Sequence, residues 1–221
     1  MSLEERMLNH PVFFESEEEA HFARFLDFHV KPGESVFVLT DQNTREHCLP
    51  LMRNKLPADF PLKIIEVPAG ETHKTLETCY SVWEILSDKL ADRQSVLINL
   101  GGGVVSDLGG FAASVFKRGI RFVHMPTSLL AMADASIGGK TGIDLKGLKN
   151  ILGTFAQPLA VFIDTQFLKT LPERELNNGF AEMLKHGLIS EYSYFKELVK
   201  DGPDNVTAEQ IRISVEIKSD I

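Results

Sequence analysis

The sequence has little cysteine and no long apolar run. Its two cysteines, Cys48 and Cys79, lack CxxC spacing and lie in segments with helical character, which favours buried free thiols over metal ligands. The first twenty residues contain no apolar stretch long enough for the core of a signal peptide, and no later segment has the apolar length of a membrane span. These absences predict a cytoplasmic protein.

Basic residues are also in deficit. The 23 lysines and arginines are outnumbered by 31 aspartates and glutamates, which gives a formal net charge of -8. A protein of this charge repels nucleic acid and anionic membranes, so neither is expected as a partner. An anionic small molecule therefore has to meet a local basic site. With 43% hydrophobic residues, the 221-residue chain is long enough to bury a large core.

Short apolar runs alternate with helical periodicity as far as Asp164. The runs are rich in β-branched residues and predict buried strands over residues 35–40, 62–67, 95–100, 121–125 and 160–163. Between them, apolar residues recur at helical spacing over residues 75–90 and 105–116. This order predicts an α/β fold with a Rossmann-like, doubly wound parallel sheet flanked by helices, whose ligands bind at the carboxyl ends of the strands.

Only helical patterns follow Asp164. We therefore expect an α/β domain over residues 1–164 and the beginning of an all-helical second domain over residues 165–221. The last helical pattern is still amphipathic at Ile221 and carries no glycine, asparagine or proline stop signal. This pattern predicts that the helical domain continues beyond Ile221.

A glycine turn joins the predicted strand at 95–100 to the next helix. Gly101, Gly102 and Gly103 lie where backbone N–H groups and a helix amino terminus can hold a phosphate, although a plain tight turn has the same signature. The usual dinucleotide fingerprint is not matched, because Ser106 takes the third glycine position and no acidic residue follows about 20 residues later. Asp107, in the first helical turn, is predicted either to cap the helix or to accept hydrogen bonds from a sugar or a metal-bound hydroxyl.

The loop after the predicted strand at 62–67 carries a second polar cluster. Within it, Glu71 can accept hydrogen bonds from ribose hydroxyls and Lys74 can contact a phosphate. A solvated helix start is the alternative interpretation of this charged pair. Because the loop follows a parallel strand, it is expected at the ligand-binding edge of the sheet.

Lysines, hydroxyl residues and glycines are interleaved between Thr127 and Gly153. This segment is predicted to be a loop in which Lys140 and Lys149 approach an anionic ligand while the glycines leave the backbone accessible. The GGKTG sequence within it is not a nucleotide triphosphatase P-loop, because the spacing of that motif requires a glycine where Asp134 stands.

A fourth group of chemically active residues shares one face of a predicted helix. Glu182, Lys185 and His186 are separated by helical i to i+3 and i to i+4 spacing. They form either a simple ion pair or two of the ligands of a zinc site, for which no third ligand is evident from spacing.

Taken in order, these motifs resemble the 3-dehydroquinate synthase family from Thr40 to Ile221. The resemblance rests on PAGETHK, GGGVVSDLGGF, MPTSLLAMADASIGGKTG, LKNILGTFAQP, LKTLPERE and GFAEMLKHGLI, which follow one another along the chain. It implies NAD contacts from Asp41, Glu71, Lys74, Gly102, Gly103, Val104, Val105, Ser106, Asp107, Thr127, Ser128, Lys140, Lys149, Phe167, Leu168, Lys169 and Thr170.

The same resemblance implies a substrate and metal site. Substrate contacts fall on Asp134, Lys140, Asn150 and Lys185, and Arg118 is expected to reach the site of a neighbouring subunit in a homodimer. Glu182 is the implied ligand of Zn²⁺ or Co²⁺, and the two histidine ligands of the family are expected beyond Ile221. His186 stands where the family more often has tyrosine, so it is not assigned as a ligand. Ser106 and Ser128 replace the commoner glycine and threonine, which predicts an altered NAD affinity.

The implied reaction converts 3-deoxy-D-arabino-heptulosonate 7-phosphate, a phosphorylated sugar acid, into 3-dehydroquinate and phosphate in the shikimate pathway. It proceeds by NAD-mediated transient oxidation, elimination, reduction and aldol closure. Alternatives are another sugar-phosphate cyclase of the inosose or valiolone type, a glycerol dehydrogenase-like enzyme, and an inactive NAD-binding module. The segments DASIGGKTG and LKNILGTF favour the cyclases.

Overall fold

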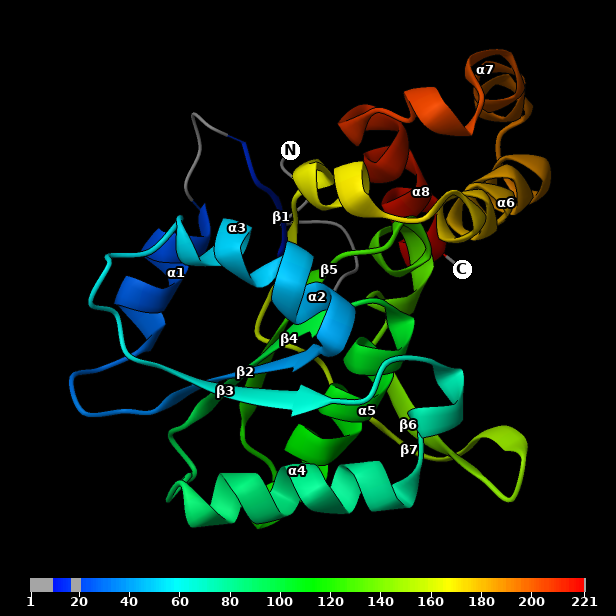
Figure 1. Cartoon of the computed structure of the whole chain (residues 1–221). Coiled ribbons are helices and arrows are strands. Elements are labelled where there is room, and N and C mark those ends of the chain that lie inside the picture. Colours follow the sequence, from blue (N-terminus) through cyan, green and yellow to red (C-terminus); the bar gives the residue numbers. More distant parts are fainter. Residues whose placement is uncertain (1–9, 17–20, 221) are drawn as a thin grey trace.

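The computed structural model describes residues 10–16 and 21–220, and its centre is a six-stranded parallel sheet (Figure 1). The strands lie side by side in the order β1-β8-β5-β4-β2-β3, and every neighbouring pair is parallel. Their bounds are β1 Val12–Phe14, β2 Val36–Asp41, β3 Leu62–Val67, β4 Val96–Gly101, β5 Arg121–Pro126 and β8 Val161–Ile163. The five predicted strands and the α/β fold class are confirmed. The short edge strand β1 was not predicted.

Helices cover both faces of this sheet. The alternation of side chains along β2 shows the two layers, because Val36 and Val38 join one hydrophobic cluster while Phe37 and Leu39 join another. The helices of the second cluster are α4 Leu76–Asp88 and α5 Gly103–Val115, which confirm the two predicted helices. The other face is covered by α1 His21–His29, α2 Gln42–His47 and α3 Leu49–Arg53 together with the carboxyl-terminal helices (Figure 1).

Helical segments follow β8, as expected. They are the 3-10 helix η5 Thr165–Thr170, α6 Glu173–Ile189, α7 Tyr192–Asp201, η6 Pro203–Asn205 and α8 Ala208–Asp220. Their buried residues, among them Phe180, Leu198 and Ile211, belong to the same hydrophobic cluster as the strand residues Val123 and Phe162. The hydrophobic core therefore continues across residue 164. The division of the chain into two domains at this residue stays a prediction.

The segment between Lys140 and Phe155 is not the loop that its glycines and lysines predict. It forms an antiparallel hairpin of β6 Lys140–Leu145 and β7 Leu148–Phe155, in which Gly142 lies opposite Gly153. A Cβ atom on Gly153 would lie 2.2 Å from the carbonyl oxygen of Thr141, so the glycine permits close strand pairing here. A second departure from a loop is the π-helix η4 Ala131–Ala135, which precedes the hairpin.

Both cysteines are free and buried, which confirms the prediction for them. Burial raises the pKa of Cys48 to about 11 and that of Cys79 to about 12. Both thiols are therefore protonated at neutral pH and unreactive as nucleophiles.

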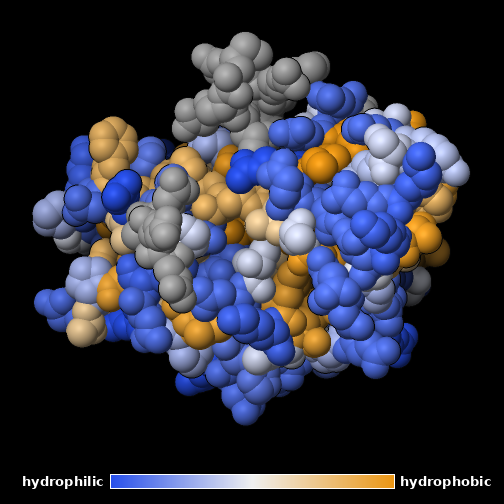
Figure 2. Space-filling model, turned by 90° about the horizontal axis from the view of Figure 1, so that it is seen from above, coloured by the Kyte–Doolittle hydropathy of each residue, from blue (hydrophilic) through white to orange (hydrophobic). Residues whose placement is uncertain are grey.

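No helix in the described residues is long and apolar enough to cross a membrane. Seen from above, the surface is mostly hydrophilic, with hydrophobic residues in separate areas rather than in one continuous face (Figure 2). Exposed apolar side chains of this scattered kind are normal for a folded protein.

A buried histidine on β5 predicts acid sensitivity. His124 is 3% exposed, and its Nδ1 lies 3.3 Å from the Nδ2 of Asn99. The pKa of His124 is lowered to about 3, mainly by burial and to a smaller extent by the charge of the nearby His10. Between this value and the ordinary histidine pKa near 6.5, the unfolded chain binds a proton that the folded chain does not. The contribution of His124 to the free energy of unfolding is therefore fully present above about pH 6.5 and is lost as the pH falls.

The free energy of unfolding is expected to fall by roughly 2 kcal/mol at pH 5 because of this one residue. Urea titrations of the wild type and His124→Asn at pH 7.5 and pH 5 isolate the effect, since the other acid-sensitive groups are common to both proteins. An identical pH dependence in the two proteins would contradict the assignment.

Candidate active site

The main candidate site lies where the strand order reverses. From β2 the chain passes to β3 on one side and then to β4 on the other, so the carboxyl ends of β2 and β4 flank a topological switch point. A cavity of about 700 Å³ opens at this edge of the sheet. It is lined by predicted nucleotide contacts, namely Asp41, Glu71, Lys74, Gly102, Gly103, Val104, Asp107, Thr127, Ser128, Lys149, Phe167 and Thr170.

The glycine turn forms one wall of this cavity. Gly102 is the N-cap of α5 and supplies no side-chain cap, so the first N–H groups of the helix have no side-chain acceptor. Gly101 has no room for a side chain, because a Cβ atom there would lie 2.4 Å from the Cβ of Val105. An uncapped helix amino terminus beside a cavity suits an anionic ligand, which favours the phosphate-binding interpretation of this turn.

Asp41, at the end of β2, also lines this cavity. Its Oδ1 accepts a hydrogen bond of 2.8 Å from the backbone N–H of Thr44, and its own N–H donates to the Thr44 hydroxyl at 3.0 Å. This capping box fixes the carboxylate at the start of α2, where it lines the cavity.

Lys74 and Asp107 form a partly buried ion pair between two elements of the site. The Nζ of Lys74 lies 2.5 Å from Asp107 Oδ2 and also donates to Asn150 Oδ1 at 2.6 Å. Burial raises the pKa of Asp107, and the positive charge of Lys74 opposes that shift. The interpretation as a solvated helix start is therefore wrong for Lys74, which is 3% exposed, but agrees with the exposed Glu71 at the start of the 3-10 helix η2 Glu71–His73. The capping interpretation of Asp107 is wrong, because Asp107 pairs with Lys74 and the N-cap of α5 is Gly102.

The neighbouring pair at the cavity mouth is exposed. Lys149 Nζ lies 2.8 Å from Glu71 Oε1, and the hydrogen bond to Glu71 raises the pKa of Lys149. Glu71 is thus bound to a lysine of β7 rather than to the other charged residue of its own loop. Because both side chains are accessible, the pair can open to admit a ligand.

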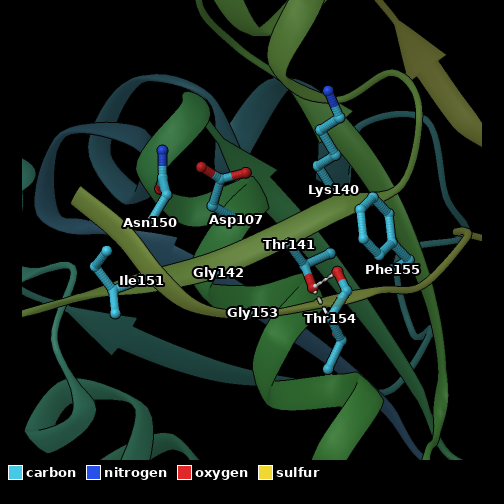
Figure 3. A pocket seen from close by; sticks show the side chains of 9 residues that line it. All are labelled: Asp107, Lys140, Thr141, Gly142, Asn150, Ile151, Gly153, Thr154 and Phe155. Atoms are coloured by element: carbon cyan, nitrogen blue, oxygen red, sulfur yellow. Dashed lines mark hydrogen bonds between the residues drawn. The ribbon is translucent and has the colours of Figure 1, made fainter.

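A second cavity of about 350 Å³ lies along the hairpin and shares Asp107 and Asn150 with the first. Figure 3 shows the side chains of Asp107, Asn150 and Lys140 projecting to the same side of β6 and β7. Asn150 has a left-handed φ of 56°, and its N–H donates to Asp144 Oδ1 at 2.9 Å. The structure therefore brings two predicted substrate residues, Lys140 and Asn150, next to the nucleotide cavity.

The other two predicted substrate residues belong to a separate cluster between α6 and η4. His186 Nε2 lies 3.5 Å from Glu182 Oε1 and 3.9 Å from Asp134 Oδ1. Lys185 forms the expected ion pair with Glu182, and Lys218 of α8 pairs with Asp134 at 2.6 Å. Burial lowers the pKa of His186, whereas the charge of Glu182 opposes that shift.

Asp134, Glu182 and His186 can hold a metal ion. One ligand atom from each residue lies within 4.8 Å of the others. Two carboxylates and one imidazole are a donor set that suits Zn²⁺. Sequence spacing found Glu182 and His186 but missed Asp134 as a third donor, because Asp134 comes from a distant π-helix.

Close packing of α6 against η4 assembles this cluster. A Cβ atom on Gly179 would lie 2.4 Å from the backbone nitrogen of Leu130, so the helices approach at a distance that only glycine allows. Behind η4, the hydroxyls of Ser106 and Ser136 lie 3.3 Å apart and are both buried. The serine that departs from the family pattern thus contacts the segment that presents Asp134.

Several predicted residues do not line the nucleotide cavity, and several unpredicted ones do. Val105 and Ser106 are buried in α5. Leu168 and Lys169 are not among the residues that line the cavity. Arg118 is exposed and has a φ of 68°. Lining residues that the sequence interpretation missed include Asn43, Thr44, His47, Cys48, Arg174 and Glu175. Nothing in their local pattern marked them, since the fold alone brings α2 and the start of α6 to this edge.

The chain resembles known proteins in sequence. A family model described as 3-dehydroquinate synthase N-terminal matches residues 64–178. A 3-dehydroquinate synthase from Parabacteroides distasonis is 46% identical over 166 residues, which are 75% of this chain and 47% of that protein. Another from a Nitratiruptor species is 47% identical over 195 residues, which are 87% of this chain and 55% of that protein. The chain therefore spans about half the length of these curated relatives.

Solved structures agree with the sequence match. A 2-epi-5-epi-valiolone synthase from Streptomyces hygroscopicus, with NAD⁺ and Zn²⁺ bound, superposes with a TM-score of 0.80 and 27% identity over 96% of this chain and 59% of that one. A sulfoacetaldehyde reductase from Bifidobacterium kashiwanohense shares the fold at a TM-score of 0.74 but only 10% identity, covering 96% of this chain and 65% of that one. Because the family model covers more than half of its residues, this chain belongs to the 3-dehydroquinate synthase family, whose N-terminal domain the model describes.

Proposed function

We propose that the chain is the nucleotide-binding part of a 3-dehydroquinate synthase and that NAD occupies the 700 Å³ cavity. The observation that carries this proposal is the composition of the cavity wall. Family motifs from five separate places in the sequence meet there, around an uncapped helix amino terminus and a buried lysine, Lys74. A pyrophosphate needs both features.

The proposed substrate is the phosphorylated sugar acid 3-deoxy-D-arabino-heptulosonate 7-phosphate. Lys140 lies beside the nucleotide cavity, while Lys185 and Lys218 lie at the carboxylate cluster, so cationic side chains are available for a phosphate and a carboxylate. Asn150, held by Lys74 and Asp144, offers its amide nitrogen to a substrate hydroxyl or carboxylate. These positions divide the binding of the substrate between the hairpin and α6.

Bound NAD would supply a transient oxidant for a substrate hydroxyl, and a Zn²⁺ or Co²⁺ ion held by Glu182 would supply a Lewis acid. The protein's own part is to hold the substrate between the hairpin and α6 and to fix its anionic groups with lysines. Lys218 and Lys185 are paired with Asp134 and Glu182 there. Because phosphate is eliminated and the hydroxyl is restored, the proposed reaction has no net redox change.

The proposed enzyme is a homodimer in the cytoplasm. Arg118 supports a role between subunits, since it is exposed at the end of α5 and is held in a left-handed conformation by the turn Phe116–Arg118. An exposed arginine with a fixed backbone can reach a neighbouring molecule without reordering the chain.

Another sugar-phosphate cyclase is the second candidate. It is favoured by the 27% identity to a valiolone synthase, whereas the 46% and 47% identities to 3-dehydroquinate synthases favour the first. The two candidates differ in substrate, so an assay with each cyclase substrate separates them.

The test is phosphate release and 3-dehydroquinate formation by a fusion of this chain to the carboxyl-terminal half of the Nitratiruptor enzyme, with NAD⁺ and Zn²⁺ present. We expect turnover of the heptulosonate phosphate without net NADH, and a loss of roughly 100-fold or more in Lys140→Ala. Lys200→Ala, which alters an exposed lysine, serves as the matched control. Turnover of a valiolone or inosose precursor instead, or net reduction of NAD⁺ by glycerol, would contradict the proposal.

A further inference from the structure

A bulge interrupts the β6–β7 hairpin beside the nucleotide cavity. Two regular strand pairs enclose this bulge, namely Ile143 with Leu152 and Leu145 with Leu148. Between these pairs, β6 contributes Asp144 alone, whereas β7 contributes residues 149–151. Bulges re-aim side chains and are frequent next to active sites. Here Lys149 and Asn150, both in the bulged part of β7, help to form the wall of the 700 Å³ cavity.

Asp144 connects the two sides of the bulge to the loop before α4. Its Oδ1 accepts a hydrogen bond of 2.9 Å from the N–H of Asn150, and its own N–H donates to the carbonyl oxygen of Lys74 at 2.8 Å. The Nζ of Lys74 donates to Asn150 Oδ1 at 2.6 Å. These contacts close a ring of hydrogen bonds through Lys74, Asp144 and Asn150, so the position of each residue depends on the other two.

Asn150 depends on this ring because of its backbone conformation. Its φ of 56° is in the left-handed region, which is unfavourable for a residue with a side chain, although asparagine tolerates it better than most. The carboxylate of Asp144 offsets this cost by accepting the hydrogen bond from the Asn150 N–H. The neighbouring Lys149 is held by an exposed pair with Glu71, and exposed pairs contribute little. Loss of the Asp144 carboxylate should therefore let residues 149–151 relax.

Asp144 itself is not among the residues that line either cavity. We propose that Asp144 is a positioning residue of the active site, whose carboxylate fixes the bulge that presents Lys149 and Asn150 to NAD and to the substrate. The inference rests on the proposed function and adds to it a residue that acts through its neighbours. A role in the stability of the hairpin alone is the competing explanation.

The test is calorimetric titration of the 221-residue chain with NAD⁺. Asp144→Ala, which removes the acceptor of the Asn150 N–H, should weaken binding roughly tenfold. Asp144→Asn should retain most of the affinity, because its side-chain oxygen can accept the same hydrogen bond. Asp92→Ala is the matched control. The Oδ1 of Asp92 also accepts a hydrogen bond of 2.9 Å from a backbone N–H, that of Gln94, but it lies before β4, at the opposite end of that strand from the cavity.

Two further readouts separate positioning from stability. In the fusion enzyme, Asp144→Ala should raise KM for the heptulosonate phosphate roughly tenfold and change kcat less, whereas Asp144→Asn should restore KM. Hydrogen exchange of the Asn150 amide needs no ligand, and its protection should be lost in Asp144→Ala and kept in Asp144→Asn. Thermal unfolding checks that each variant is folded.

Wild-type NAD⁺ affinity in Asp144→Ala, or an equal loss of affinity in Asp92→Ala, would make Asp144 a structural residue only and would overturn the proposal. An equal loss in Asp144→Asn would also contradict it, since the hydrogen bond would then not be the cause. A wild-type chain that binds no NAD⁺ would contradict the proposed function itself, and the inference with it. Failure of the inference alone therefore gives a different result from failure of the proposed function.

Discussion

Replacing Lys55 by methionine is expected to lower the free energy of unfolding by about 3 kcal/mol, because it removes the lysine that pairs with two buried carboxylates. The Nζ of Lys55 lies 2.9 Å from Asp164 Oδ2 and 3.7 Å from Glu15 Oε2. The side chains of Glu15 and Asp164 are only 1% and 3% exposed. Burial already raises the pKa of Glu15, and the charge of Lys55 opposes that shift.

This network connects distant parts of the chain. Glu15 accepts a hydrogen bond of 2.9 Å from the N–H of Phe22 at the start of α1, and Asp164 accepts one of 2.9 Å from Gln166 at the start of η5. Since η5 carries Phe167 and Thr170 into the nucleotide cavity, loss of the network should also loosen that wall.

Urea unfolding of Lys55→Met measures the effect, and Lys200→Met on the exposed face of α7 is the matched control. The double variant Lys55→Met, Glu15→Gln should regain part of the lost stability, because one of the orphaned charges is removed. Equal stabilities for Lys55→Met and Lys200→Met would show that the buried triad contributes nothing.

Lys74→Met is expected to destabilise the protein by about 2 kcal/mol, less than Lys55→Met because its partner Asp107 is 20% exposed. The substitution keeps the length of the side chain but removes the hydrogen bonds to Asp107 and Asn150. The hairpin then loses one side-chain attachment to the loop before α4, whereas the exposed Lys149–Glu71 pair and the backbone bond from the Asp144 N–H to the Lys74 carbonyl stay in place.

A double-mutant cycle separates the charge effect from lost packing. Asp107→Asn in the Lys74→Met background should restore much of the stability, since the carboxylate that Lys74 neutralised is gone. Thermal unfolding of the four proteins gives the coupling. If the effects of the two substitutions simply add, the ion pair is not the cause of the loss.

The parallel sheet was predictable because its strands are buried on both faces. Residues 96–100 are apolar except for Asn99, and such continuous runs are typical of central parallel strands. The three-residue strand β1 is too short to produce a pattern of its own. It is a strand only because β8 offers it an edge.

The hairpin was not predictable from local pattern. Gly142 and Gly153 weaken the usual strand signal, and the exposed Lys149 and Asn150 suggest a loop. Only the structure shows that these glycines pair across β6 and β7. The ligand-binding interpretation of the segment nevertheless agrees with its position beside the cavity.

The position of a site residue was predictable where that residue directly follows a strand. It was not predictable where the packing of helices against one another brings the residues together. The glycine turn, Asp41 and Lys74 lie after predicted strands, so their common edge follows from parallel topology. The partnership of Asp134 with His186 and Lys218 depends on how α6 and α8 pack against η4. No spacing rule connects residues so far apart in the sequence.

The most direct test of the central claim is calorimetric titration of the 221-residue chain with NAD⁺. The account predicts saturable binding of one NAD⁺, which Gly103→Asp abolishes without loss of stability. A Cβ atom at Gly103 meets only the Cβ of Ala135, at 3.4 Å, and the new carboxylate would occupy the place of a phosphate. Gly103→Ala controls for the added bulk. Wild-type NAD⁺ affinity in Gly103→Asp, or no binding by the wild type, would contradict the assignment of this cavity.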